Sequence, residues 1–172
     1  MGWGGAQPAG RGGDAATCGG GRFALTLQGH EHYLRLGDAG TMTLYGPERP
    51  PGWVGKLPLQ ERFAFLGKGP FDLPAVPFTA EVSESVLSGQ GLAWHRVNLG
   101  ADGLVCSTPE RAMLELCDGV SDAALVYEAD ALMQAMTTLR PQRVGLLLRH
   151  CRSIKEVTLL HFFRHLRSRR CA

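Results

Sequence analysis

Apolar and polar residues alternate in several short runs in the first part of the chain, a pattern typical of strands with one buried face. Four runs bounded by turn-forming residues predict strands, at residues 41–46, 62–67, 92–99 and 103–106. The last two are separated by a short turn around Asp102, and we expect them to pair as a hairpin. The prolines of segment 73–84 leave it open between an edge strand and a loop.

Helical spacing of apolar residues marks one segment before these strands and most of the chain after them. Residues 22–37 roughly follow the helical period and predict a helix that ends at Gly37, with Gly29 weakening its middle. Four further helices are predicted from four start signals in the last part of the chain: Ser107, Ser121-Asp122, Arg140-Pro141 and Ser153.

The stretch STPERAMLEL shows how one of these starts is encoded. Ser107 and Glu110 have the S-x-x-E spacing of a capping box, and Pro109 falls in the first turn, where its missing N–H is tolerated. If Thr108 is the cap instead, Pro109 takes the first helical position and a helix still begins here. Ser153 and Glu156 repeat the same spacing.

The order of these elements predicts the fold class. Strands followed by helices indicate an α+β domain, with a small mixed sheet from the N-terminal half packed with a C-terminal bundle of about four helices. Residues 1–21 are rich in glycine and poor in large apolar side chains, so we expect a disordered tail. The folded domain is then expected over residues 22–170.

The amino-acid composition indicates in which cellular compartment this domain is expected. In 172 residues, 44% of them apolar, no run is long and apolar enough to predict a membrane span. Five cysteines at uneven spacings, without C-x-x-C, favour reduced thiols and a cytoplasmic protein. The 18 basic residues include only three lysines, a bias typical of a GC-rich prokaryotic genome.

Charge is distributed unevenly along the chain. Residues 140–172 contain nine Lys or Arg and one acid, a net charge of +8, whereas residues 1–139 carry −6. Such a segment is either a solvated helical face, with some arginines offsetting a helix dipole, or a surface for an anionic partner. The candidate residues for binding nucleic acid or another partner are Arg140, Arg143, Arg149, Arg152, Lys155, Arg164 and Arg167.

Signals for catalysis or metal binding are weak. His161 and His165 have an i, i+4 spacing without the H-E-x-x-H motif, and His30 and His32 would point to opposite faces of a helix. Cys106 has no recognisable catalytic partner, and no nucleophile elbow or complete phosphate loop occurs. We expect no catalytic residue, metal or cofactor. A degenerate nuclease-like or nucleotide-handling enzyme stays open as an alternative, as does an interaction module that docks an acidic partner.

Four segments together suggest a family. In order along the chain they are GGRFALTLQGHEHYLRLG, TLYGP, STPERAMLELCDGVSD and ADALMQAMTTLRPQRVGLLLRHCRSIKEVTLLHFF. Over roughly residues 20–166 the sequence resembles the C-terminal domain of the AbiEi-family antitoxins of type IV toxin–antitoxin (abortive-infection) systems. STPERA and the segment from LRP to CRSIK are the most specific parts of the resemblance.

The resemblance implies a function and partners. Relatives carry an N-terminal winged helix-turn-helix that reads operator DNA, repress their own operon, and counter a toxin, often without contacting it. The glycine-rich segment before Arg22 is too short for a winged helix, and relatives continue beyond the end of this chain into a strand-containing tail. We therefore expect a non-catalytic antitoxin-like module that lacks the DNA-reading domain. Its expected partners are the cognate toxin system and DNA, bound through the basic C-terminal helices.

Overall fold

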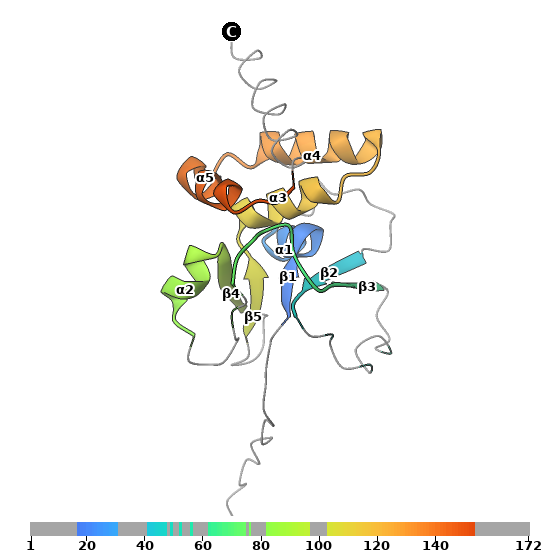
Figure 1. The fold of residues 1–172 in the computed structure, drawn as a ribbon. Helices are drawn as coiled ribbons and strands as arrows, with labels where there is room; N and C mark the ends of the chain where they lie inside the picture. Colours follow the sequence, from blue (N-terminus) through green and yellow to red (C-terminus); the bar gives the residue numbers. More distant parts are fainter. Residues whose placement is uncertain are drawn as a thin grey trace, which may run out of the picture.

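The structure is a computed structural model of the whole chain, shown as a ribbon in Figure 1. It describes five stretches and four isolated positions: residues 17–30, 41–47, 62–74, 82–96 and 103–153, with 49, 52, 56 and 76. A five-stranded sheet lies on one side of the molecule and helices gather at one end of it (Figure 1). This arrangement confirms the predicted α+β class.

The strands form a mixed sheet in the order β3-β2-β1-β5-β4. Their bounds are β1 (Cys18–Gly20), β2 (Thr41–Tyr45), β3 (Arg62–Leu66), β4 (Leu92–Arg96) and β5 (Gly103–Ser107). Strand β1 pairs antiparallel with β2 and parallel with β5, and β2 pairs parallel with β3. The predicted hairpin is confirmed, because β4 and β5 are antiparallel neighbours with Trp94 opposite Val105.

Strand β1 at the centre of the sheet corrects the predicted tail. Residues 18–21 belong to the ordered body, whereas residues 1–16 lie outside the described residues. The glycines that suggested disorder permit close packing here. A Cβ on Gly19 would lie 2.7 Å from the Phe23 ring, and one on Gly20 would collide with Glu115 Oε2 and with Tyr45 at 2.5 Å. Gly19 and Gly20 therefore reflect crowding around a central strand.

Five helices accompany the sheet in the described part of the chain. Their bounds are α1 (Gly21–Leu27), α2 (Glu84–Gly89), α3 (Pro109–Asp118), α4 (Ala123–Ala135) and α5 (Pro141–Arg149). Helix α1 stops earlier than predicted, because the chain leaves helical geometry at Gln28 and Gly29 adopts φ = +83°. Helix α2 was not predicted, and it packs beside β4 (Figure 1).

The start of α3 confirms the helix but not the capping box. Thr108 is the N-cap and Pro109 the first helical residue, without a side-chain cap. The Ser107 hydroxyl instead donates to Glu115, and Glu110 accepts from Arg140. Both side chains are buried, so they serve contacts with distant parts of the chain.

Helices α4 and α5 begin at the predicted residues. The Asp122 side chain accepts a hydrogen bond of 3.0 Å from the Leu125 N–H, and Arg140 precedes Pro141 at the start of α5. The predicted fourth helix, from Ser153, lies outside the described residues. No helix in the described ranges has the length and apolar character to cross a membrane.

Two apolar clusters cover the two faces of the sheet. Val105 and Cys106 are neighbours in β5, so their side chains point to opposite faces. Cys106 joins a cluster with Leu25 of α1, Met113 of α3 and Leu132 of α4. Val105 joins the second cluster, whose other members are Cys18, Tyr45, Val76, Leu87 and Leu92. Helices α1, α3 and α4 therefore share the first cluster, whereas Leu147 of α5 packs with Phe71 and Leu114. The second cluster borders the site described next.

Candidate functional site

Arg140, the first predicted binding residue, is held by a carboxylate of the same chain. Its Nε lies 2.9 Å from Glu110 Oε1, and its backbone N–H also donates to that oxygen at 3.3 Å. Burial alone would raise the pKa of Glu110, but the hydrogen bonds from Arg140 and from backbone N–H groups outweigh it and lower that pKa. Arg140 itself stays 56% exposed while Glu110 is buried. The pair fixes the start of α5 against the start of α3.

Arg152, after α5, is also paired inside the domain. Its Nη2 contacts Asp72 Oδ1 in an exposed ion pair. Backbone bonds reinforce this contact: the Arg152 N–H donates to Pro70 at 2.8 Å, and the Asp72 N–H donates to His150 at 2.7 Å. The loop before Asp72 is thus fastened to the end of α5.

Arg143 and Arg149 have no ion pair with any other described residue. Arg149 is exposed in the last turn of α5. Arg143 is half-buried and donates a long bond of 3.4 Å to the Ser88 carbonyl, beside a groove of about 430 Å³ between α2 and α5. The remaining predicted residues, Lys155, Arg164 and Arg167, lie outside the described part of the chain.

A second group of charged residues lies under α3, where none was predicted. Glu115 is buried and accepts three kinds of donor: the Gly21 N–H at 2.8 Å, the Ser107 hydroxyl at 2.8 Å and Arg111 Nε at 2.8 Å. These donors come from α1, β5 and α3. One carboxylate therefore ties helix α1, the end of strand β5 and helix α3 together.

Arg111 is the cation of this network, and only 7% of its surface is exposed. Beyond its bond to Glu115, Nη1 donates to the Gln90 carbonyl at 2.8 Å, and the guanidinium lies 5.1 Å from the centre of the Phe71 ring. Burial, the largest single effect, would lower the pKa of Arg111, but the charge of Glu115, its hydrogen bond to Arg111 and smaller electrostatic effects of Cys18 and Tyr45 together raise it. Arg111 is therefore a permanent buried cation.

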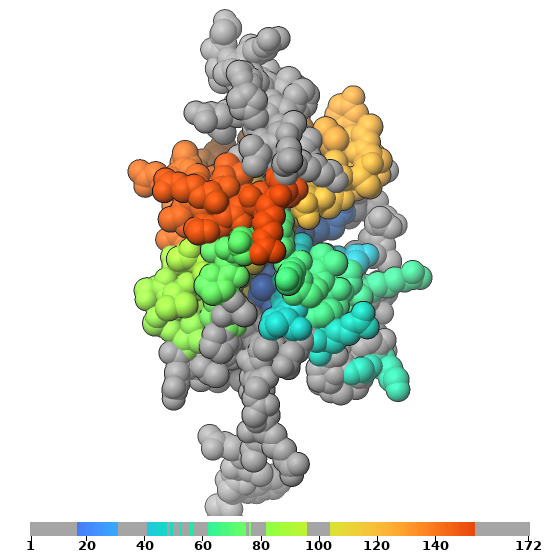
Figure 2. All heavy atoms as spheres, viewed as in Figure 1, coloured from blue at the N-terminus to red at the C-terminus, as the bar shows by residue number. Residues whose placement is uncertain are grey.

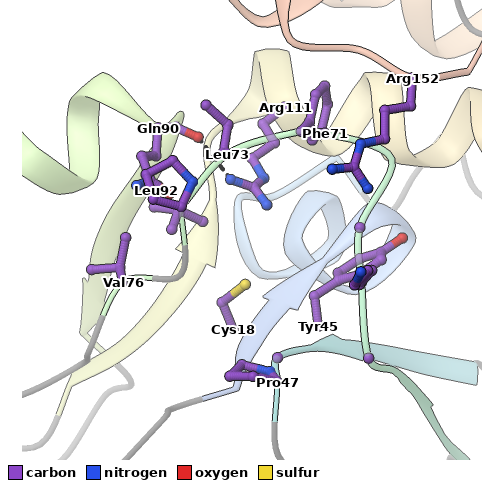
Figure 3. A pocket seen from close by; sticks show the side chains of 15 residues that line it. Cys18, Tyr45, Pro47, Phe71, Leu73, Val76, Gln90, Leu92, Arg111 and Arg152 are labelled. Atoms are coloured by element: carbon purple, nitrogen blue, oxygen red, sulfur yellow. Dashed lines mark hydrogen bonds between the residues drawn. The ribbon is translucent and has the colours of Figure 1, made fainter.

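Arg111 borders a cavity of about 350 Å³. Figure 3 shows its guanidinium pointing into the cavity, above the Cys18 and Tyr45 side chains and across from Arg152. In the space-filling view the same region is a hollow between the green and cyan segments, with blue atoms of the N-terminal part at its floor (Figure 2). Lys68 also lines it, and within the described ranges no Asp or Glu does.

Two further polar groups that line the cavity, the Cys18 thiol and the Tyr45 hydroxyl, are neutral. Burial, with a smaller effect from the Glu115 charge, raises the pKa of the Cys18 thiol to about 12, and the same two causes raise the pKa of Tyr45. Both groups keep their protons at neutral pH. Among the described residues no group of three or more His, Cys, Asp or Glu side chains is placed to hold a metal ion.

A comparison with models of known protein families assigns the chain to one family. Residues 39–168 match the family described as "Transcriptional regulator, AbiEi antitoxin, Type IV TA system". The chain belongs to this family. Comparisons with curated proteins and with solved structures gave no significant match.

The AbiEi match confirms the resemblance and locates it on the structure. It contains strands β2 to β5, helices α2 to α5, and all the described arginines of α5. Strand β1 and helix α1 precede the matched range but supply the centre of the sheet and one donor to Glu115. The folded unit of this AbiEi protein therefore includes residues before the matched range.

Sequence reasoning missed Arg111, Glu115 and Lys68. One signal was available in the sequence. Arg111 and Glu115 have the i, i+4 spacing of a helical ion pair, in a segment whose apolar residues predict the buried face of a helix. Lys68 stands between two glycines, a pattern with no specific meaning in sequence. Its role depends on the fold, which brings residues 67–69 to the cavity mouth.

Proposed function

We propose that this AbiEi-family chain is a cytoplasmic antitoxin that acts by binding and catalyses no reaction. The family match supports the antitoxin role, since it spans most of the described α+β domain. The observation that supports a binding role is the unneutralised positive charge of the arginines on α5. Arg143 and Arg149 present positive charge that no carboxylate in the described residues neutralises.

The helix dipole explains only part of this charge. Arg149 lies in the last turn of α5, where a cation offsets the partial negative charge of the helix end. Arg143 lies near the start of the same helix, where a cation gains nothing from the dipole. An anionic partner at this position, such as the phosphate backbone of nucleic acid, would supply the missing interaction.

Arg140 and Arg152 have a different role in this proposal. Each is about half exposed, yet each holds a carboxylate and fixes one end of α5. Their first function is to position the helix, and their outer donors add to the positive field around it. The proposed contact residues are therefore Arg143 and Arg149, with Lys155, Arg164 and Arg167 as sequence-based candidates.

Co-expression with the toxin encoded beside the gene tests the proposal. The full chain should restore growth, whereas the double variant Arg143→Glu and Arg149→Glu should restore little. A matched control reverses two exposed charges elsewhere, Lys56→Glu and Arg62→Glu, and should protect like the wild type. Equal protection by the two double variants would exclude α5 as the active surface, and no protection by the wild type would contradict the antitoxin role.

The nature of the partner follows from a gel shift with duplex DNA at increasing salt concentration. Contacts between arginine and phosphate release counterions, so binding should weaken with salt, and less steeply in the double variant. Absence of any shift at low salt would instead favour an acidic protein as the partner of α5.

A further inference from the structure

We propose that the cavity below Arg111 binds a small organic anion, a carboxylate or phosphate attached to an apolar body. This site differs from the α5 surface, although Arg152 borders both, and it does not depend on the proposed antitoxin role. Three independent features support it: an incompletely used buried arginine, the charge of the cavity mouth, and the character of its walls.

The donors of Arg111 are only partly used within the domain. Nε binds Glu115 and Nη1 binds the Gln90 carbonyl, whereas Nη2 makes no hydrogen bond to another described residue. Figure 3 shows the guanidinium directed into the cavity. A buried guanidinium with an unused donor favours an acceptor in front of it, and an anion makes the strongest such bond.

The charges around the cavity favour an anion over a cation. Lys68 and Arg152 line it together with Arg111, and none of the lining residues that the structure describes is acidic. Glu115 is held on the inner side by its own donors, and Asp72 binds Arg152 with a side chain that is 70% exposed. Lys68 has no ion pair with a described residue, so its charge is available at the mouth.

The walls indicate an apolar body for the ligand. Tyr45, Phe71, Leu73, Val76 and Leu92 supply aromatic and aliphatic surface around the charged end. Cavities that bind small molecules usually measure about 300–1,000 Å³ and combine such walls with a few polar groups. The cavity of about 350 Å³ lies at the small end of this range, which fits a single ring or a short chain bearing one anionic group.

Gly69 offers a way to close the cavity without changing its charge. A Cβ at this position would lie 3.5 Å from Tyr45 and 3.7 Å from Arg111 Nη2, which is ordinary contact distance. Alanine would therefore fit, but the longer side chain of Gly69→Leu would occupy the space in front of the guanidinium. Gly52 is exposed and has nothing within 4 Å of its Cβ position, so Gly52→Leu is the matched control.

Isothermal titration of the purified full chain tests the inference. The probes are benzoate, inorganic phosphate and the uncharged benzyl alcohol. We expect at least one anion to bind and benzyl alcohol not to bind. Binding of phosphate alone would assign the site to a phosphate head, and binding of benzoate alone to a carboxylate with an apolar body. Absence of binding by both anions, or equal binding of benzyl alcohol, would overturn the inference.

Two variants locate the bound anion. Gly69→Leu should abolish binding, and Lys68→Gln should weaken it about two- to fivefold, the effect of one exposed charge pair. Gly52→Leu and Lys56→Gln should bind like the wild type. Because Lys68 is exposed, its substitution should leave the fold intact even if Gly69→Leu fails to fold. Unchanged affinity in Lys68→Gln, together with unchanged affinity in a folded Gly69→Leu protein, would overturn the inference.

Discussion

Glu115 shows how much one buried carboxylate contributes to the organisation of this domain. Its partners Gly21 and Ser107 lie 94 and 8 residues away in sequence, and Arg111 lies one helical turn before it. The carboxylate is buried, so its charge depends on all three donors for compensation. The close approach of Gly20 to the same carboxylate explains why strand β1 has a glycine at this position.

Gly20→Ala should destabilise the protein by about 1–3 kcal/mol, the usual effect of forcing an extra methyl group into a packed interior. The added Cβ would meet Tyr45 at 2.5 Å and also collide with Glu115, whose donors prevent it from moving aside. Urea unfolding of the purified chain measures the change. Gly145→Ala is the control, since nothing lies within 4 Å of its Cβ position, and it should be neutral or slightly stabilising. Equal stability of the two variants would contradict the crowding around β1.

Arg140→Gln should make folding less stable at neutral pH, and the loss should shrink in acid. The pKa of Glu110 lies below its ordinary value of 4.5 in the folded protein, so the pair stabilises the fold above that pH. Its contribution disappears as the pH falls through the lowered pKa, because Glu110 is then protonated with or without Arg140. Urea midpoints at pH 7 and below pH 4 give the comparison, and Arg149→Gln is the control. A difference from the wild type that stays constant with pH would contradict the pairing.

At the scale of secondary-structure elements, the starts of α4 and α5 could be predicted from sequence because the residues that signal a helix start act locally. Asp122 and Pro141 act within one turn of their own helices, and the structure has α4 and α5 beginning there. The capping box at Ser107 failed for a non-local reason. Glu110 is taken by Arg140, 30 residues later, and a local pattern contains no information about such a partner.

Strand β1 and the cavity could not be predicted for a related reason. Three residues of Cys-Gly-Gly carry no strand signal, and they become a strand only because β2 and β5 pair on either side. The cavity needs Lys68, Arg111 and Arg152 at one place, which the docking of the loop before Asp72 onto the end of α5 achieves. Arg140 and Arg152, which flank α5, were among the candidate residues from sequence, but their partners Glu110 and Asp72 were not.

Asp122→Ala should destabilise the domain by about 1 kcal/mol, the usual effect of losing an N-cap side chain. The carboxylate accepts from the Leu125 N–H, which would be left with water as its partner. The midpoint of urea unfolding measures the effect. Ser121→Ala, at the exposed preceding residue, is the control and should change stability little. A larger loss in Ser121→Ala would show that the helix is capped differently.

For the whole molecule, the sheet and the helices depend on each other through a few residues near the start of the described chain. Strand β1 joins the β2–β3 pair to the β5–β4 pair, and Gly21 after it donates to Glu115 in α3. A substitution that displaces β1 from the sheet should therefore separate the two halves of the sheet and remove the contact between Gly21 and α3. The antitoxin role proposed for this AbiEi protein belongs to that assembled body.

Co-expression of the toxin with the wild type, Gly20→Ala or Gly145→Ala tests this claim most directly. The growth temperature lies between the unfolding midpoints of Gly20→Ala and the wild type, and immunoblots establish how much of each protein is present. We predict that the wild type and Gly145→Ala restore growth and that Gly20→Ala does not. Full protection by Gly20→Ala under these conditions, or none by the wild type, would contradict the claim that the folded domain carries the antitoxin activity.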